Sequence, residues 1–161
     1  MVIRDELYEI GIAQRRKMFG TPGSDAVVDH TTGVNDKIED FVTRQTFGDI
    51  WQRPGLSIKD RSKVTFAMLV ATGKPHELRV HARGAIANGV TPIELREIVL
   101  QALLYCGIPA AVEGVRGLND VFRDLGIPPI LDGEAEATRR MKSESPKAEK
   151  KSDGKKSSKK K

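Results

Sequence analysis

One glutamate and one histidine stand four residues apart in an otherwise apolar part of the sequence. At that spacing Glu77 and His81 occupy the same face of a helix. A carboxylate beside an imidazole favours the charged ring, or fixes which ring nitrogen carries the proton. The pair is therefore suited to general acid or base catalysis, although the same spacing is also typical of an ordinary surface pair.

Arginines in the same region are candidates for binding an anionic substrate. Arg53 lies in a turn and Arg61 near the start of a helix, whereas Arg79 and Arg83 flank His81. Two residues along a helix turn the direction by roughly 200°, so the flanking pair points away from His81. Because guanidinium groups bind carboxylates in a bidentate manner, Arg53 and Arg61 are the candidate substrate ligands. Each is equally compatible with a solvated or salt-bridged surface position.

The aromatic residues and the single cysteine give weaker signals. Trp51 and Tyr105 are of types that more often fill a core, but the Tyr105 hydroxyl is also a candidate substrate contact. Cys106 is the only cysteine, which excludes an intrachain disulfide. Its apolar neighbours, with no adjacent cation in the sequence, predict a buried, unreactive thiol. The three histidines are scattered without metal-ligand spacing, so no metal site is expected.

Hydrophobic periodicity and local stop signals predict an all-α bundle of about six helices that positions these residues. The capping box Thr91-Pro92-Ile93-Glu94 is the strongest local start signal. Asn88-Gly89 and Gly126 are expected to end helices. The expected helices cover residues 3–19, a segment from 35 to about 47, a segment from 57 or 60 to 72, and 75–87, 92–106 and 109–125.

The first of these helices has a predicted apolar face, and a loop is predicted to follow it. The face carries Ile3, Leu7, Ile10, Ala13 and Met18. Thr21-Pro22-Gly23-Ser24 is expected to stop the helix, so residues 20–33 are predicted as a loop. The last three helices are apolar over wide arcs, which favours burial on more than one side and hence a homo-oligomer.

Charge is distributed unevenly along the 161 residues. Residues 142–161 hold nine lysines and three acids, whereas residues 1–141 hold 18 basic and 19 acidic residues. The predicted organisation is one helical domain over residues 1–133 and a disordered Lys-rich tail over 134–161. A nucleic-acid-binding face is not expected on the folded part, although the tail is suited to non-specific binding. No signal segment or membrane span is expected, which favours the cytoplasm.

Taken together, these residues resemble the γ-carboxymuconolactone decarboxylase family over roughly residues 5–126. The combination is more specific than any single motif. In the alkylhydroperoxidase D-type branch of the fold, a CxxC pair precedes the histidine, but Lys74 and Glu77 hold the comparable positions here. The resemblance rests on Trp51, Arg53-Pro54-Gly55-Leu56, Asp60-Arg61-Ser62, Glu77-Leu78-Arg79, His81, Arg83-Gly84-Ala85, Asn88-Gly89, Thr91, Glu94, Tyr105-Cys106-Gly107 and Pro109-Ala110-Ala111.

The resemblance implies an all-α homo-oligomer, typically a hexamer, that decarboxylates a small carboxylated lactone of protocatechuate breakdown without a cofactor. His81 would then be the proton donor, oriented by Glu77, and Arg53, Arg61 and Tyr105 would bind the substrate. Two alternatives stay open. One is a decarboxylase or isomerase of another lactone or keto acid on the same fold. The other is a non-enzymatic oligomeric binding protein.

Overall fold

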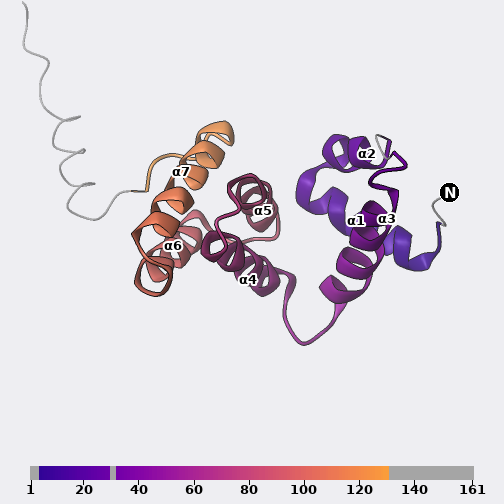
Figure 1. Cartoon of the computed structure of the whole chain (residues 1–161), viewed down its shortest axis with the longest axis horizontal. Coiled ribbons are helices and arrows are strands. Elements are labelled where there is room, and N and C mark those ends of the chain that lie inside the picture. Colours follow the sequence, from indigo (N-terminus) through magenta and orange to yellow (C-terminus); the bar gives the residue numbers. More distant parts are fainter. Residues whose placement is uncertain (1–3, 30–31, 131–161) are drawn as a thin grey trace, which may run out of the picture. The chain divides into compact units, whose positions relative to one another are not determined.

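The computed structural model describes residues 4–29 and 32–130, and all of its helices lie within one compact unit, Met1–Pro129. The described residues form seven α-helices, one π-helix and one 3-10 helix, with no strand, which confirms the predicted all-α class. The predicted domain boundary after residue 133 and the Lys-rich tail lie outside the described residues. The elements in order are α1 Glu6–Phe19, α2 Thr21–Asp29, α3 Asp36–Phe41, the π-helix η1 Val42–Asp49, the 3-10 helix η2 Ile50–Gln52, α4 Ile58–Ala71, α5 Pro75–Ala87, α6 Pro92–Cys106 and α7 Ile108–Asp124 (Figure 1).

The last four helices begin and end where the sequence predicts. Ser57 caps α4 by accepting from the Asp60 backbone, and Thr91 and Glu94 form the predicted capping box of α6. Pro75 lies in the first turn of α5, where its missing N–H costs nothing. Figure 1 shows these helices in succession, and α4 packs on α5 while α6 packs on α7. Their shared core contains Phe66, Leu78, Leu95, Val99 and Val121, each at most 2% exposed.

The predicted loop over residues 20–33 is wrong, because Thr21–Asp29 forms α2. Gly20 ends α1 with a positive φ of 78°, and its N–H bonds to the Arg16 carbonyl. The chain then starts a new helix at once. Pro22 occupies the first turn of that helix, where proline is tolerated, so the Thr-Pro-Gly segment begins a helix as well as ending one.

The predicted apolar face of the first helix is also wrong in part. Leu7 and Ile10 are exposed, whereas Tyr8, Ile12 and Arg15 are buried. Ile3 lies outside the described residues, and Met18 is buried as predicted. The buried face includes a glycine and an arginine, which hydropathy does not count as apolar, so the periodicity indicated the wrong side of the helix.

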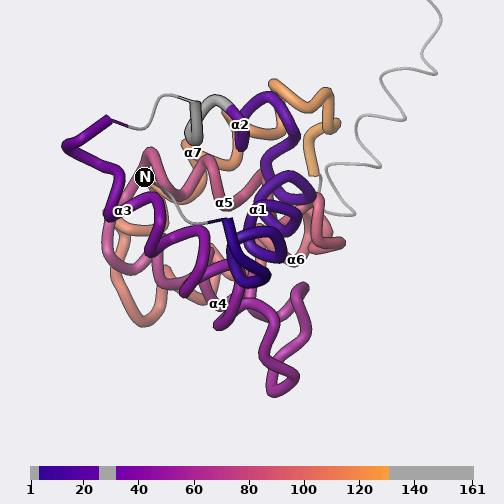
Figure 2. Tube along the Cα trace, turned by 90° about the vertical axis from the view of Figure 1, so that its right-hand side faces the viewer, coloured from indigo at the N-terminus to yellow at the C-terminus, as the bar shows by residue number. Residues whose placement is uncertain are grey.

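A close contact between α1 and η1 decides which face of α1 is buried. A Cβ on Gly11 would lie 1.9 Å from the Thr43 carbonyl oxygen, and one on Gly48 would lie 2.2 Å from the Leu7 carbonyl oxygen. Only glycines allow two helical backbones to approach so closely. Helix α1 packs against η1 through this contact and against α5 as well (Figure 2).

Candidate active site

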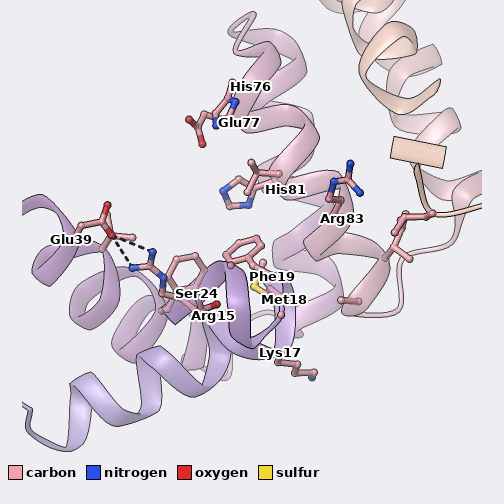
Figure 3. Close-up of a pocket in the computed structure, with 18 of the residues that line it drawn as sticks. Arg15, Lys17, Met18, Phe19, Ser24, Glu39, His76, Glu77, His81 and Arg83 are labelled. Carbon is pink, nitrogen blue, oxygen red and sulfur yellow. Dashed lines mark hydrogen bonds and ion pairs between the residues drawn. The ribbon is translucent and has the colours of Figure 1, made fainter. Parts of the chain in front are cut away.

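A cavity of about 1070 Å³ lies between α5 on one side and α1, α2, α3 and η1 on the other. Figure 3 shows His76, Glu77 and His81 on the α5 wall and Arg15 and Glu39 on the opposite wall. The lining is mainly apolar with charged groups at a few points. It comprises Arg15, Lys17, Met18, Phe19, Gly20, Gly23, Ser24, Ile38, Glu39, Val42, Phe47, His76, Glu77, Val80, His81, Arg83, Ile86, Ala87 and Leu125.

His81 lies at the apolar end of this cavity, among aromatic rings. Its ring meets Phe19 edge-on at 5.7 Å between centroids and lies 6.5 Å from the Trp51 ring. The Nδ1 atom is buried without a hydrogen-bond partner. Burial lowers the pKa of His81 below its ordinary value, and the negative charge of Glu77 opposes that shift only in part. The unliganded imidazole is therefore mainly neutral at pH 7.

Glu77 lies one helical turn before His81 and lines the same cavity, as the i,i+4 spacing predicts. Its side chain is exposed. No hydrogen bond joins Glu77 to the Nδ1 atom of His81, which is buried without a partner in the described structure. Glu77 acts on the imidazole through its charge, which favours the protonated ring.

Arg15, which no sequence motif singled out, lies on the wall opposite His81. Arg15 is buried, with only 6% of the residue exposed. Nη1 donates to Glu39 at 3.1 Å and to the Thr43 hydroxyl at 2.8 Å, and Nη2 donates to the same Glu39 oxygen at 3.2 Å. The guanidinium also lies 5.8 Å from the centre of the Phe47 ring. In the sequence, Arg15 stands one helical turn from both Ile12 and Met18. An arginine at such a position is also typical of a surface charge, so the spacing alone does not indicate burial.

Three predicted substrate ligands lie outside the lining of this cavity. Arg53 is exposed, and its carbonyl accepts from Arg61 Nη2 at 2.8 Å. Tyr105 is 79% exposed near the end of α6. Cys106, next to it, is exposed as well, so the prediction of a buried thiol is wrong for this chain. The apolar residues around Cys106 in the sequence are themselves exposed at the α6–α7 junction, which explains the error.

The two arginines beside His81 in the sequence pair with α7. Arg79 donates to Asp120 at 2.9 Å, and Arg83 pairs with Asp124. These ion pairs direct both guanidinium groups away from the imidazole, as the helical geometry predicts. Arg83 still lines the cavity near Leu125.

Two further features of the described residues bear on the class of site. No group of three or more His, Cys, Asp or Glu side chains is arranged to hold a metal ion within this part of the chain. Within the same residues, no helix has the length and apolar character needed to cross a membrane. The chemical groups that line the cavity are two imidazoles, of which that of His81 is the more buried, two carboxylates, one serine hydroxyl and several cations.

The described residues form a small all-α domain in which the imidazole of His81 lies beside the rings of Phe19 and Trp51. The chain belongs to the carboxymuconolactone decarboxylase family, which matches residues 37–120. It is 37% identical over 125 residues to the 4-carboxymuconolactone decarboxylase of Acinetobacter baylyi, covering 78% of this chain and 93% of that protein. It is also 37% identical over 119 residues to the nitrosuccinic acid decarboxylase of Metarhizium robertsii, covering 74% of this chain and 83% of that protein. The family that the sequence motifs indicated is confirmed.

Proposed function

We propose that this chain is a carboxy-lyase that converts 4-carboxymuconolactone to the β-ketoadipate enol-lactone in protocatechuate catabolism. The observation that carries the proposal is the 37% identity to a 4-carboxymuconolactone decarboxylase over nearly the whole of that relative. A cavity that places one shielded imidazole among apolar and charged groups supports it. The reaction needs no metal or cofactor, because the substrate contains its own electron acceptor.

The chemistry follows from the substrate. One carboxylate sits on the ring carbon that also bears the lactone oxygen. Breaking its C–C bond releases CO₂ and leaves an electron pair, which moves through the ring double bond onto the lactone carbonyl oxygen. A proton then adds to the ring carbon next to that carbonyl. Each turnover therefore consumes one proton and develops negative charge on oxygen before the proton arrives.

His81 is the proposed proton donor. The imidazole is mainly neutral without substrate because burial lowers its pKa. An anionic substrate entering the cavity brings negative charge close to the ring, which raises the pKa and favours the imidazolium. Glu77 contributes to the same effect through its own charge. The cavity thus favours the protonated form of His81 when substrate is present.

Arg53, Arg61 and Tyr105 remain proposed substrate-binding residues. None of them lines the cavity of the single chain, so a role in binding requires a second copy of the chain or movement around η2. Trp51 in η2 lies close to His81, which puts Arg53 two residues from the aromatic wall of the site.

The proposed assembly is a homo-oligomer, and the family resemblance favours a hexamer. Leu104, Tyr105 and Ile108 at the α6–α7 junction are 77%, 79% and 68% exposed in the single chain. Adjacent apolar side chains of that size usually mark a protein–protein interface. The cytoplasm is the proposed location, and non-specific nucleic-acid binding is proposed only for the Lys-rich tail.

A second candidate is decarboxylation of a different small acid on the same site. The relative from Metarhizium robertsii is named for nitrosuccinic acid and is as similar to this chain as the lactone decarboxylase. A nitro group, like a conjugated carbonyl, accepts the electron pair that departing CO₂ leaves. The same imidazole would then protonate the resulting carbanion.

CO₂ release from each of the two acids, at equal concentration and with a chelator present, decides between these candidates. The first proposal predicts that kcat/KM for 4-carboxymuconolactone exceeds that for nitrosuccinic acid, with an ultraviolet change that matches CO₂ release. A preference for nitrosuccinic acid would favour the second candidate. No CO₂ from either acid, with a correctly folded protein, would contradict both.

A further inference from the structure

Arg15 has one edge whose donors are not used by the protein. A guanidinium carries five N–H donors. Both hydrogens of Nη1 are directed to Glu39 and Thr43, and Nη2 donates to the Glu39 oxygen that Nη1 also contacts. Nε is buried and has no partner. The edge formed by Nε and the outer hydrogen of Nη2, called the open edge below, therefore has no hydrogen-bond partner, although Nε is buried. This edge is one of those that bind a carboxylate in a bidentate manner.

A second unpartnered donor lies on the same side of the cavity. Ser24, on α2, is only 1% exposed, and its hydroxyl has no hydrogen-bond partner. Both Ser24 and Arg15 line the cavity, and Figure 3 shows them on the side opposite the α5 wall that carries Glu77. A buried polar group without a partner destabilises the folded chain unless water or a ligand satisfies it. These two donors on one cavity wall are available to a ligand with acceptor oxygens.

The two relatives are named for acids that share one chemical fragment. Each contains a carbon that bears the departing carboxylate together with a CH₂–COO⁻ arm, that is, a substituted succinate. The electron acceptor differs, being a conjugated lactone carbonyl in one and a nitro group in the other. The carboxylate that remains on the product is thus common to both. A site that acts on such acids needs a cation for this spared carboxylate, away from the proton donor.

We propose that Arg15, together with Ser24, binds the carboxylate that stays on the product, and so makes the enzyme selective for 2-substituted succinates. This inference rests on the proposed decarboxylase function. The spared carboxylate docks on the Nε–Nη2 edge while Glu39 keeps its place on the other side of the guanidinium. Because Nε is shielded from water in the unliganded chain, binding includes a side-chain shift at this wall. The spared carboxylate is thereby held on the wall opposite His81.

A structural role for the Arg15–Glu39 pair is the competing explanation, since the pair joins α1 to α3. The two explanations differ in what Glu39 contributes. If the pair only holds the helices together, removing either partner has the same effect. If Arg15 binds substrate, Glu39→Gln preserves selectivity, because the open edge of the guanidinium remains.

The test compares two substrates in four variants. The substrates are 4-carboxymuconolactone and its analogue in which only the CH₂–COO⁻ arm is a carboxamide. Wild type is expected to prefer the diacid by about 10- to 100-fold in kcat/KM, the usual effect of a hydrogen-bonded charge. Arg15→Gln is expected to lose most of that preference and Arg15→Lys to keep part of it. Glu39→Gln and the surface control Arg16→Gln, whose side chain pairs with Asp25, should keep the full preference.

Equal loss of activity on both substrates in Arg15→Gln, with the preference unchanged, would overturn the proposal. So would a loss of preference in Glu39→Gln as large as that in Arg15→Gln. If wild type does not turn over the lactone at all, the proposed function fails and binding decides the inference separately. Calorimetry with succinate and its monoamide should then show tighter binding of succinate by wild type but not by Arg15→Gln, and equal affinities would overturn the assignment.

Discussion

At the residue scale, the environment of His81 sets how its activity depends on pH. The aromatic rings around it remove water from the imidazole, and this desolvation lowers the pKa more than Glu77 raises it. Such an imidazole is a poor proton donor without substrate, because it is mainly unprotonated. It becomes a good proton donor when a bound anion favours the imidazolium. Its residue type and spacing were readable from the sequence, whereas its low pKa arises from tertiary contacts with Phe19 and Trp51.

The pH profile of wild type is the first prediction. Because kcat/KM reports the free enzyme, it should fall as pH rises through a midpoint below about 6.5, where His81 loses its proton. The profile of kcat should have a higher midpoint, since bound anionic substrate stabilises the imidazolium. Steady-state kinetics between pH 5 and 8.5 measures both.

Glu77→Gln is the matched variant for this profile. Removing the carboxylate removes the charge that raises the His81 pKa, so the kcat/KM midpoint should move to lower pH. A kcat/KM that is flat from pH 5 to 8, or that rises with pH, is incompatible with His81 acting as the protonated donor.

At the same scale, neither the burial of Arg15 nor its pairing with Glu39 could be predicted from the sequence. Its partner Glu39 is 24 residues away, and its burial depends on the approach of η1. Neither the distance nor the burial follows from local spacing, so a buried arginine is indistinguishable from a surface one until the helices are packed.

At the element scale, the helices with local signals were predictable and those shaped by packing were not. The bounds of α4 to α7 were predicted closely from local signals. These signals are the capping box at Thr91, the prolines in first helical turns and the glycines that end helices. In contrast, α2 and the π-helix η1 were not predicted as such, and both pack against α1. A π-helix has no reliable local sequence signature, and such helices often lie near functional sites, as η1 does here through Phe47.

Gly11→Ala tests the close contact between α1 and η1. The new methyl group would overlap the Thr43 backbone carbonyl, which cannot rotate away, so the helices must separate. Overpacking of this kind costs about 1–3 kcal/mol or more in the free energy of unfolding. Urea denaturation measures the loss.

Gly23→Ala is the control for that experiment, because a Cβ at this helical position meets no atom within 4 Å. It should leave stability unchanged or raise it by about 0.5–1 kcal/mol, the usual gain for alanine over glycine in a helix. A Gly11→Ala protein as stable as the Gly23→Ala protein would contradict the described packing.

The contribution of Glu94, at the start of α6, to the free energy of unfolding should depend on pH. Lys63, the Thr91 backbone and Lys59 together lower the pKa of Glu94 to about 2, below that of an unfolded glutamate. Its stabilising effect is therefore complete above about pH 4.5 and is lost as pH falls toward 2. Glu94→Gln should lower the unfolding free energy at pH 7 but not near pH 2. A difference from wild type that does not change over this range would rule out the Glu94 charge as its cause.

At the scale of the whole molecule, the sequence predicted the class of fold, and the motifs predicted the family. The assembly was argued from apolar helix faces, and the single chain leaves such a face exposed at the α6–α7 junction. Cys106 is exposed, contrary to the prediction, because the sequence pattern alone does not distinguish a core from an apolar surface.

Introducing charge at this junction tests the proposed assembly. The double variant Leu104→Asp and Ile108→Asp should reduce the molar mass measured by sedimentation, because two buried charges at an interface are costly. Val34→Asp, at a site 91% exposed on another part of the chain, is the control and should keep the wild-type mass. An unchanged mass in the double variant would place the interface elsewhere.

The most direct measurement of the central claim is the rate of CO₂ release from 4-carboxymuconolactone by wild type and by His81→Gln, with a chelator present. Steady turnover is expected of wild type, and a decrease of about 10²- to 10⁴-fold in kcat is expected of the variant, the usual contribution of a general acid. Circular dichroism and sedimentation would show that the variant keeps its fold and mass. Near-wild-type turnover by a folded His81→Gln protein would contradict the assignment of His81 and of this cavity as the active site.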